Sequence, residues 1–102
     1  MDFSEACDFL FSCANYEAQP AHVYNRKAFS LSRVHELLSR LGDPHTDYPS
    51  IHIAGTKGKG SVAAMAESIL RAANYRAGLY TSPHLCDVRE RFRVGQETIS
   101  EA

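Results

Sequence analysis

The 102-residue sequence predicts an α/β fold, and two features of the chain carry this prediction. A glycine-rich turn at Gly55–Gly60 separates a β-branched run from an amphipathic helical pattern, and a second strand-like run follows that helix. Two further helical patterns precede this unit. A strand, a helix and a strand in this order form a βαβ unit, which predicts a parallel strand pair with a right-handed crossover.

The first half of the chain predicts two helices joined by a loop. Apolar residues recur at helical spacing from Phe3 to Ala14, whereas Asn15 to Lys27 is polar and contains Pro20. Ser30 is placed to cap a second helix, which Gly42-Asp43-Pro44 ends in the usual stop order. The apolar stripe of that helix is Leu31, Val34, Leu37, Leu38 and Leu41.

The second half of the chain predicts the βαβ unit and a hairpin. Strands are expected at Ser50–Ala54 and Arg76–Tyr80, with a helix at Ser61–Asn74 between them. Arg91–Val94 and Glu97–Ile99 flank Gly95-Gln96, which predicts a hairpin turn.

The predicted elements suggest an incomplete domain. A parallel sheet of two strands cannot cover both of its faces, and Ser100-Glu101-Ala102 has the pattern of the cap and first turn of another helix. We therefore expect residues 1–49 to be a helical segment of the same domain as residues 50–102, and the sequence to stop in mid-domain.

Composition excludes several classes of protein. With 44% hydrophobic and 23% charged residues the chain fits one small globular unit, and its net charge of -1 offers no attraction to nucleic acid or an anionic membrane. The acidic start, Met1 to Glu5, is unlike a secretory signal. Cys7, Cys13 and Cys86 are odd in number and lack CxxC spacing, which disfavours disulfides and a zinc site. Cys7 and Cys13 lie in an apolar run, so we expect them to be buried, reduced thiols of a cytoplasmic protein.

The segment Gly55–Ser61 carries the main chemical signal. A glycine-rich turn between a strand and a helix directs backbone N–H groups and the positive end of the helix dipole at one point, which suits phosphate. Lys59 adds a mobile positive charge for the β- and γ-phosphates and is the candidate catalytic residue. The alternative is an ordinary glycine-rich turn without a binding function, which the lysine and the flanking strand and helix disfavour. The candidate nucleotide-binding residues are Gly55, Thr56, Lys57, Gly58, Lys59, Gly60 and Ser61.

This segment departs from the general P-loop pattern at two positions. Ile53 stands where that pattern has its first glycine, and Gly60 stands where it has the Mg²⁺-binding serine or threonine. The hydroxyl comes one residue late, at Ser61. An ordinary P-loop kinase or GTPase is therefore disfavoured.

Several motifs resemble one family. His52–Ser61 resembles the ATP loop of folylpolyglutamate and dihydrofolate synthases, which belong to the Mur ligase superfamily, although Lys57 stands where many members have asparagine. Tyr80–Leu85 and Glu90–Val94 resemble two further motifs of that family. The helix before Gly42-Asp43-Pro44-His45 also resembles the family's opening, so the resemblance covers essentially the whole chain. It implies the start of a three-layer Mur-ligase-type ATP-binding domain.

The resemblance also implies a reaction and its partners. Family members use ATP and Mg²⁺ to phosphorylate a carboxylate of a folate or dihydropteroate, which L-glutamate then attacks to form an amide. It assigns Ser82, which follows a strand next to the loop, as a Mg²⁺ ligand. The alternative is that Thr81 and Ser82 satisfy turn backbone before Pro83. The parent protein is expected to be monomeric, without nucleic-acid or membrane partners.

The sequence also allows two other functions. A cell-wall amino-acid ligase would share the ATP chemistry, but those ligases usually have a hydroxyl residue where this chain has Gly60. A non-catalytic nucleotide-binding fragment is the third reading. Glu90 and Arg91 are expected to form a structural ion pair on the hairpin. Aromatic residues that could line a pteridine site or a core are Tyr16, Tyr24 and Phe29.

Overall fold

A computed structural model describes residues 1–13 and 30–102 of the chain. These residues belong to two compact units, one formed by Met1–Leu10 with His52–Ala102 and the other by Phe11–Ile51, of which residues 14–29 are not described. The three aromatic residues suggested for a pteridine site lie outside the described residues. The expected division of the chain at residue 49 stays a prediction.

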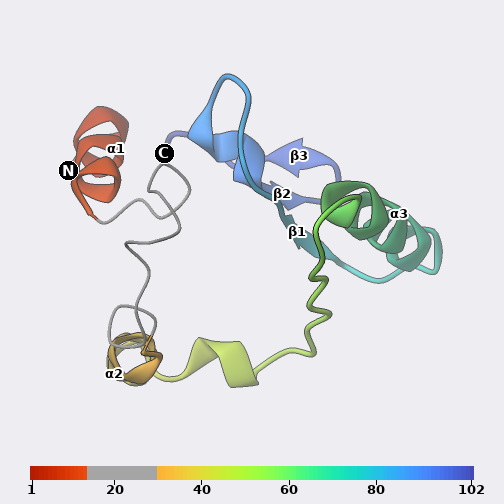
Figure 1. The fold of residues 1–102 in the computed structure, drawn as a ribbon, viewed down its shortest axis with the longest axis horizontal. Coiled ribbons are helices and arrows are strands. Elements are labelled where there is room, and N and C mark those ends of the chain that lie inside the picture. The colour runs from red at the N-terminus through yellow and green to blue at the C-terminus, as the bar shows by residue number, and fades with distance from the viewer. Residues whose placement is uncertain (14–29) are drawn as a thin grey trace. The chain divides into compact units, whose positions relative to one another are not determined.

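Helix α1, Phe3–Ser12, has a reciprocal cap at its beginning (Figure 1). The Glu5 amide donates to Asp2 Oδ1 at 2.8 Å, and the Asp2 amide donates to Glu5 Oε2 at 2.9 Å. This arrangement is a capping box, which satisfies amides that have no partner inside the helix. The predicted helix continued to Ala14, which lies outside the described residues.

Helix α2, Ser32–Arg40, ends where the sequence predicted. The Asp43 amide donates to the Leu38 carbonyl at 2.8 Å and the Gly42 amide to the Ser39 carbonyl at 3.1 Å, which together form a Schellman motif. The short 3₁₀ helix η2, Pro44–Thr46, follows.

The predicted cap of α2 is wrong. Leu31 is the N-cap residue, and no side chain caps the helix. The Ser30 hydroxyl instead bonds to the Ser32 hydroxyl at 2.9 Å and accepts from the Ser32 amide at 3.4 Å. Because Ser32 is already the first helical residue, Ser30 reaches only its amide and lies one position too early for those of Arg33 and Val34, which a cap residue binds.

Helix α3, Lys59–Ala72, follows the glycine-rich segment and packs against strand β1. It begins two residues before the predicted start at Ser61, because Gly58 occupies the N-cap position with a φ of 78° and makes Lys59 the first helical residue. Its end is a second Schellman motif, in which Asn74 has a φ of 68° and the Tyr75 amide donates to the Leu70 carbonyl at 3.0 Å.

The sheet has three antiparallel strands in the order β1-β2-β3 (Figure 1). They are β1 (Gly78–Tyr80), β2 (Phe92–Val94) and β3 (Glu97–Thr98), and a 3₁₀ helix, η3 (Val88–Arg91), precedes β2. Gly95 and Gln96 have φ of 57° and 78°, so the predicted hairpin is confirmed, with the two left-handed residues of a type I′ turn.

The predicted parallel strand pair is not formed among the described residues. Residues 50–54 have no sheet partner, and β1 pairs in an antiparallel manner with β2, Tyr80 lying opposite Phe92 with ring centroids 5.3 Å apart. A β-branched run becomes a strand only when a neighbour pairs with its backbone, and no described segment does so for residues 50–54.

None of the described residues is buried, so this part of the chain has no closed core. On α3, Val62, Met65 and Ile69 are 47%, 58% and 69% exposed. The thiols of Cys7 and Cys13 were expected to be buried, but Cys7 is half-buried and Cys13 is exposed. Cys86 is also exposed, and the three form no disulfide with one another. Within residues 1–13 and 30–102 every helix is too short or too polar to cross a bilayer.

Candidate functional site

The glycine-rich segment forms an open turn at the beginning of α3. Gly58 has a φ of 78°, a conformation that L residues rarely adopt, and it offers no side chain to cap the helix. A Cβ atom built at Gly55, Gly58 or Gly60 would meet nothing within 4 Å. The first amides of α3 are therefore uncapped beside open space, and the positive end of the helix dipole adds to their attraction for an anion.

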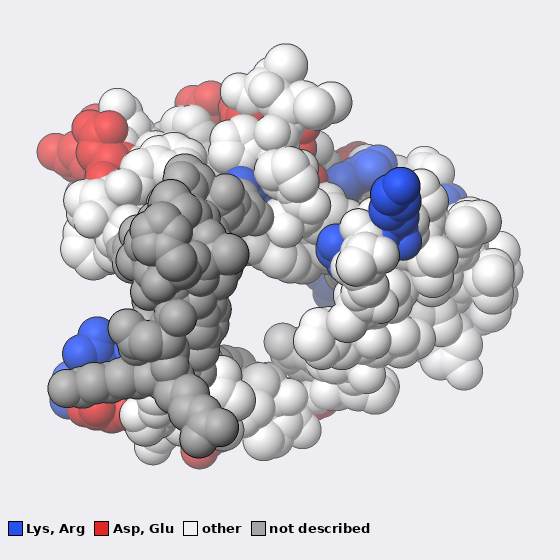
Figure 2. All heavy atoms as spheres, viewed as in Figure 1, with Lys and Arg blue, Asp and Glu red and all other residues white. Residues whose placement is uncertain are grey.

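Lys59 folds back over this turn. Its Nζ atom donates to the Gly55 carbonyl at 2.9 Å, which holds the ammonium beside the loop. The first turn of α3 contains no acidic residue. Figure 2 shows basic side chains at the surface over the beginning of this helix. The loop thus combines uncapped amides with a positive charge, which is the combination that phosphate oxygens bind.

A cleft of about 450 Å³ lies between α3 and the sheet. Gly60 contributes from the beginning of α3, and Ser82 contributes from the segment that leaves β1. The structure therefore brings Ser82 and the glycine-rich loop to one cleft, while their roles stay predictions. The lining residues are Gly60, Ala64, Leu79, Thr81, Ser82, Pro83, Leu85, Glu90, Arg93 and Thr98.

Ser82 has an exposed hydroxyl that makes no hydrogen bond to another described residue. The backbone of the turn is satisfied in other ways: the Thr81 amide donates to the Arg91 carbonyl at 3.1 Å. The Ser82–Pro83 peptide bond is cis. This geometry does not use the Ser82 hydroxyl to complete the turn, which weakens the turn-forming alternative.

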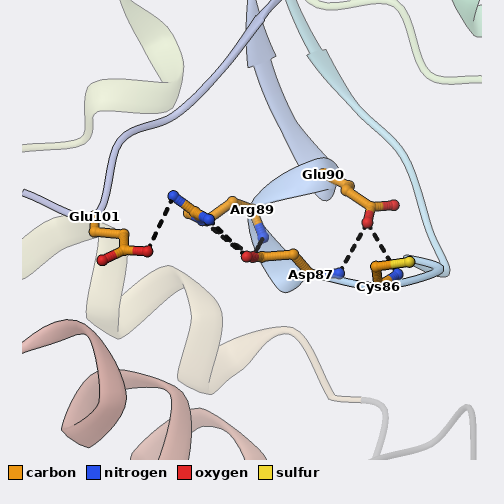
Figure 3. Close-up of polar contacts among 5 residues, drawn as sticks. All are labelled: Cys86, Asp87, Arg89, Glu90 and Glu101. Carbon is orange, nitrogen blue, oxygen red and sulfur yellow. Dashed lines mark hydrogen bonds and ion pairs between the residues drawn. The ribbon is translucent and has the colours of Figure 1, made fainter.

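The segment after Ser82 is organised around the Glu90 carboxylate (Figure 3). Its oxygens accept from the backbone amides of Leu85, Cys86 and Asp87 at 3.1, 2.9 and 2.8 Å. These amide bonds lower the pKa of Glu90, the bond from Leu85 contributing most. The Glu90 carboxylate therefore binds backbone amides instead of the expected ion-pair partner, Arg91.

Arg89 joins three parts of the same unit. Its guanidinium forms a pair with Asp87, Nη2 to Oδ2 at 2.7 Å, and a longer one with Glu101 at 3.4 Å (Figure 3). The guanidinium also lies over the Phe3 ring of α1, 5.1 Å from its centroid. The Arg89 side-chain bond, followed by its backbone bond, lowers the pKa of Asp87 to about 2, and the Asp87 bond raises the pKa of Arg89.

One of these contacts has a signal in the spacing of residues along the sequence. Asp87 and Glu90 have the spacing of a capping box, and the structure forms it around η3. The Arg91 Nε atom donates to His84 Nδ1 at 2.8 Å, a contact between residues seven apart that no local rule predicts. Among the described residues no three His, Cys, Asp or Glu side chains gather as metal ligands.

Comparisons with known proteins relate these motifs to one family. The chain is 39% identical over 102 residues to a probable bifunctional folylpolyglutamate synthase/dihydropteroate synthase of Haloferax volcanii, matching all of this chain and 11% of that protein. It is 49% identical over 81 residues to the folylpolyglutamate synthase of Candida albicans, matching 76% of this chain and 16% of that protein. A crystal structure of folylpolyglutamate synthase from Thermotoga maritima matches 97% of this chain with a TM-score of 0.79 and 43% identity.

The chain belongs to the folylpolyglutamate synthase family. The resemblance found in the motifs is thereby confirmed, and the likeness to a solved family member agrees with the predicted α/β domain of Mur-ligase type. No family model matches the chain. The chain spans 11% and 16% of the two named relatives and 20% of the solved structure. The similarity therefore gives the family of the chain and does not by itself give it the activity of a whole family member.

Proposed function

We propose that this chain carries the ATP-phosphate loop of a ligase that joins L-glutamate to a folate or dihydropteroate. The observation that carries the proposal is the cleft that Gly60 and Ser82 share, beside the uncapped beginning of α3. The names of relatives in the folylpolyglutamate synthase family supply the substrate class. Cytoplasmic folate metabolism is the proposed setting.

The proposed reaction has two steps. A carboxylate oxygen of the folate attacks the γ-phosphorus of ATP, which forms an acyl phosphate and releases ADP. The amine of glutamate then attacks the acyl carbon, an amide C–N bond forms, phosphate leaves and the amine loses a proton. The chain's contribution to such a transfer is positioning and neutralisation of the phosphoryl oxygens rather than a covalent bond.

Lys59 is the proposed catalytic residue. An ammonium has three donors, so Lys59 can keep its bond to the Gly55 carbonyl and still donate to phosphate oxygens above the loop. The amides at the beginning of α3 bind the same oxygens from below. Both groups are fixed by the backbone of one turn, which limits the reorganisation needed when charge moves during transfer.

Magnesium fits the residues at this cleft. Mg²⁺ keeps several waters and is bound by a small number of protein oxygens together with substrate phosphates. The free hydroxyl of Ser82 on the cleft of Gly60 supplies one such oxygen, and the described residues offer no three-ligand cluster that would compete for the ion. When bound, the metal would neutralise phosphate charge.

The test is ADP release by the intact ligase that contains this sequence. Release should require L-glutamate together with dihydropteroate or tetrahydrofolate, and Lys59→Ala should lower kcat about a hundredfold or more, the usual loss for one electrostatic contact in a transition state. Arg40→Ala, which removes a positive charge from α2, is the matched control and should leave the rate unchanged.

The same assay separates the rival readings. ADP release that requires a cell-wall precursor instead of a folate would move the protein to the other branch of the superfamily. Nucleotide binding without glutamate-dependent release would leave a nucleotide-binding module. Wild-type kcat/KM in Lys59→Ala would remove the loop from the mechanism.

A further inference from the structure

The segment from Thr81 to Arg91 is a loop whose two ends are joined. The Thr81 amide donates to the Arg91 carbonyl at 3.1 Å, and Ser82 is the next residue inside this closure. Three consecutive amides of the loop, those of Leu85, Cys86 and Asp87, donate to the carboxylate of Glu90. Figure 3 shows the bonds from Cys86 and Asp87. One side chain thus gathers the middle of the loop that begins at Ser82.

We propose that Glu90 is a positioning residue for Ser82: by binding the loop amides, it fixes where the Ser82 hydroxyl lies on the cleft beside the glycine-rich segment. The inference rests on the proposed function, because it gives the Ser82 oxygen a role at the phosphates. Glu90 itself lines the same cleft as Ser82 and Gly60.

The physical basis is the strength and number of these bonds. Hydrogen bonds from amides to an ionised carboxylate are shorter and stronger than those between neutral groups. Three of them on consecutive residues restrict the backbone torsions between Pro83 and Asp87, which would otherwise vary independently. The lowered pKa of Glu90 reflects the same preference of the loop for the charged carboxylate.

A second contact also joins the two ends of the loop. The Arg91 Nε atom donates to His84 Nδ1 at 2.8 Å, so the residue after Glu90 holds the residue before Leu85. This bond does not use the carboxylate oxygens, and the loop is therefore expected to shift rather than unfold when the Glu90 charge is removed. We therefore expect the Ser82 oxygen to move from its position on the cleft without leaving the cleft altogether.

Glu90→Gln is the decisive substitution. The single oxygen of the amide can take the place of Oε1, which accepts from Cys86 and Asp87. Its NH₂ group then faces the Leu85 amide. Because both groups are donors, the hydrogen bond from Leu85 is lost. Glu97→Gln, on the exposed strand β3, makes the same change of charge in the same compact unit and is the matched control.

Hydrogen exchange reports on the loop without any ligand. In Glu90→Gln the Leu85 amide should exchange about tenfold faster or more, because its bond to the charged acceptor is lost. The Cys86 and Asp87 amides, which keep a neutral acceptor, should exchange faster by a smaller factor. Amides of α3 should keep their wild-type rates, which shows that the variant is folded. Unchanged exchange at residues 85–87 would overturn the proposal.

A double-mutant cycle tests whether Glu90 acts through Ser82. In the intact ligase at saturating ATP, Glu90→Gln should raise the Mg²⁺ concentration for half-maximal ADP release by about three- to tenfold, with kcat at saturating Mg²⁺ within about twofold of wild type. In a Ser82→Ala background the same substitution should add no further shift. Equal shifts in the two backgrounds would overturn the inference.

Failure of the proposed function gives a different result. If the wild-type ligase releases no ADP with glutamate and a folate, the proposed function fails. The cycle is then read from the Mg²⁺ dependence of ATP affinity. Non-additive shifts of Glu90→Gln and Ser82→Ala in that affinity would support the positioning role, and additive shifts would overturn it.

Discussion

Gly58→Ala should weaken ATP binding without disturbing any packed side chain. Gly58 has a φ of 78°, and a Cβ atom there would meet nothing within 4 Å, so the added methyl group causes no clash. The cost is entirely that of the backbone, about 1–2 kcal/mol for an L residue in the left-handed region. We expect the empty turn of the variant to relax to another conformation, so that binding must restore the left-handed one. Because about 1.4 kcal/mol corresponds to a factor of ten, ATP affinity should then fall roughly 5- to 30-fold.

Gly95→Ala is the matched control for that prediction. Gly95 has a φ of 57° in the β2–β3 turn and also has open space around its Cβ position, so the substitution carries strain of the same kind. It should lower Tm while leaving ATP affinity unchanged. The measurement is ATP titration of the intact ligase beside thermal melting. Affinity of Gly58→Ala within twofold of wild type, or an equal loss in Gly95→Ala, would refute the assignment of the loop.

Three further predictions concern Ser82, Asp87 and the chain by itself. Ser82→Ala should raise the Mg²⁺ requirement of the ligase and hardly change the melting of the ligand-free protein, whereas early melting with an unchanged Mg²⁺ requirement would make Ser82 structural. The pKa of Asp87 is lowered from 3.8 to about 2, so its contribution to loop stability should be complete above pH 3.8 and lost as the pH falls through 2. Hydrogen exchange at Arg89 should follow this loss in the wild type, and Asp87→Asn should abolish the pH dependence. The 102-residue chain alone should release no glutamate-dependent ADP, because none of its described residues is buried; turnover of roughly 1 per second or more would contradict this.

The elements that the sequence predicted well are those whose boundaries depend on adjacent residues. The end of α2 follows from Gly42-Asp43, whose amides bind carbonyls of the preceding turn, and the hairpin follows from Gly95-Gln96. The beginning of α3 was placed two residues late, because Gly58 is the cap residue and Lys59 the first helical residue. In each case the deciding interaction lies within a few residues of the boundary.

Elements that depend on distant partners could not be predicted in the same way. Residues 50–54 have the composition of a strand, but a strand also needs a neighbour, and composition does not supply one. Ser82 and Gly60 share a cleft because α3 packs on β1, which the order of elements suggested without giving the geometry. The bond from the Asp87 amide to Glu90 could be predicted from the spacing of the two residues, whereas those from Leu85 and Cys86 could not.

The position of Lys59 has a consequence for the empty protein. A positive charge on the first residue of a helix opposes the helix dipole, and the first turn of α3 has no acidic residue to offset it. The beginning of this helix therefore favours a bound anion at the expense of the stability of the ligand-free helix. Any small anion that reaches the turn, inorganic phosphate or sulfate included, relieves this opposition and should raise the melting temperature by an amount that grows with the logarithm of its concentration relative to its Kd. Thermal shift with simple anions is thus a substrate-free measure of how strongly this helix terminus favours negative charge.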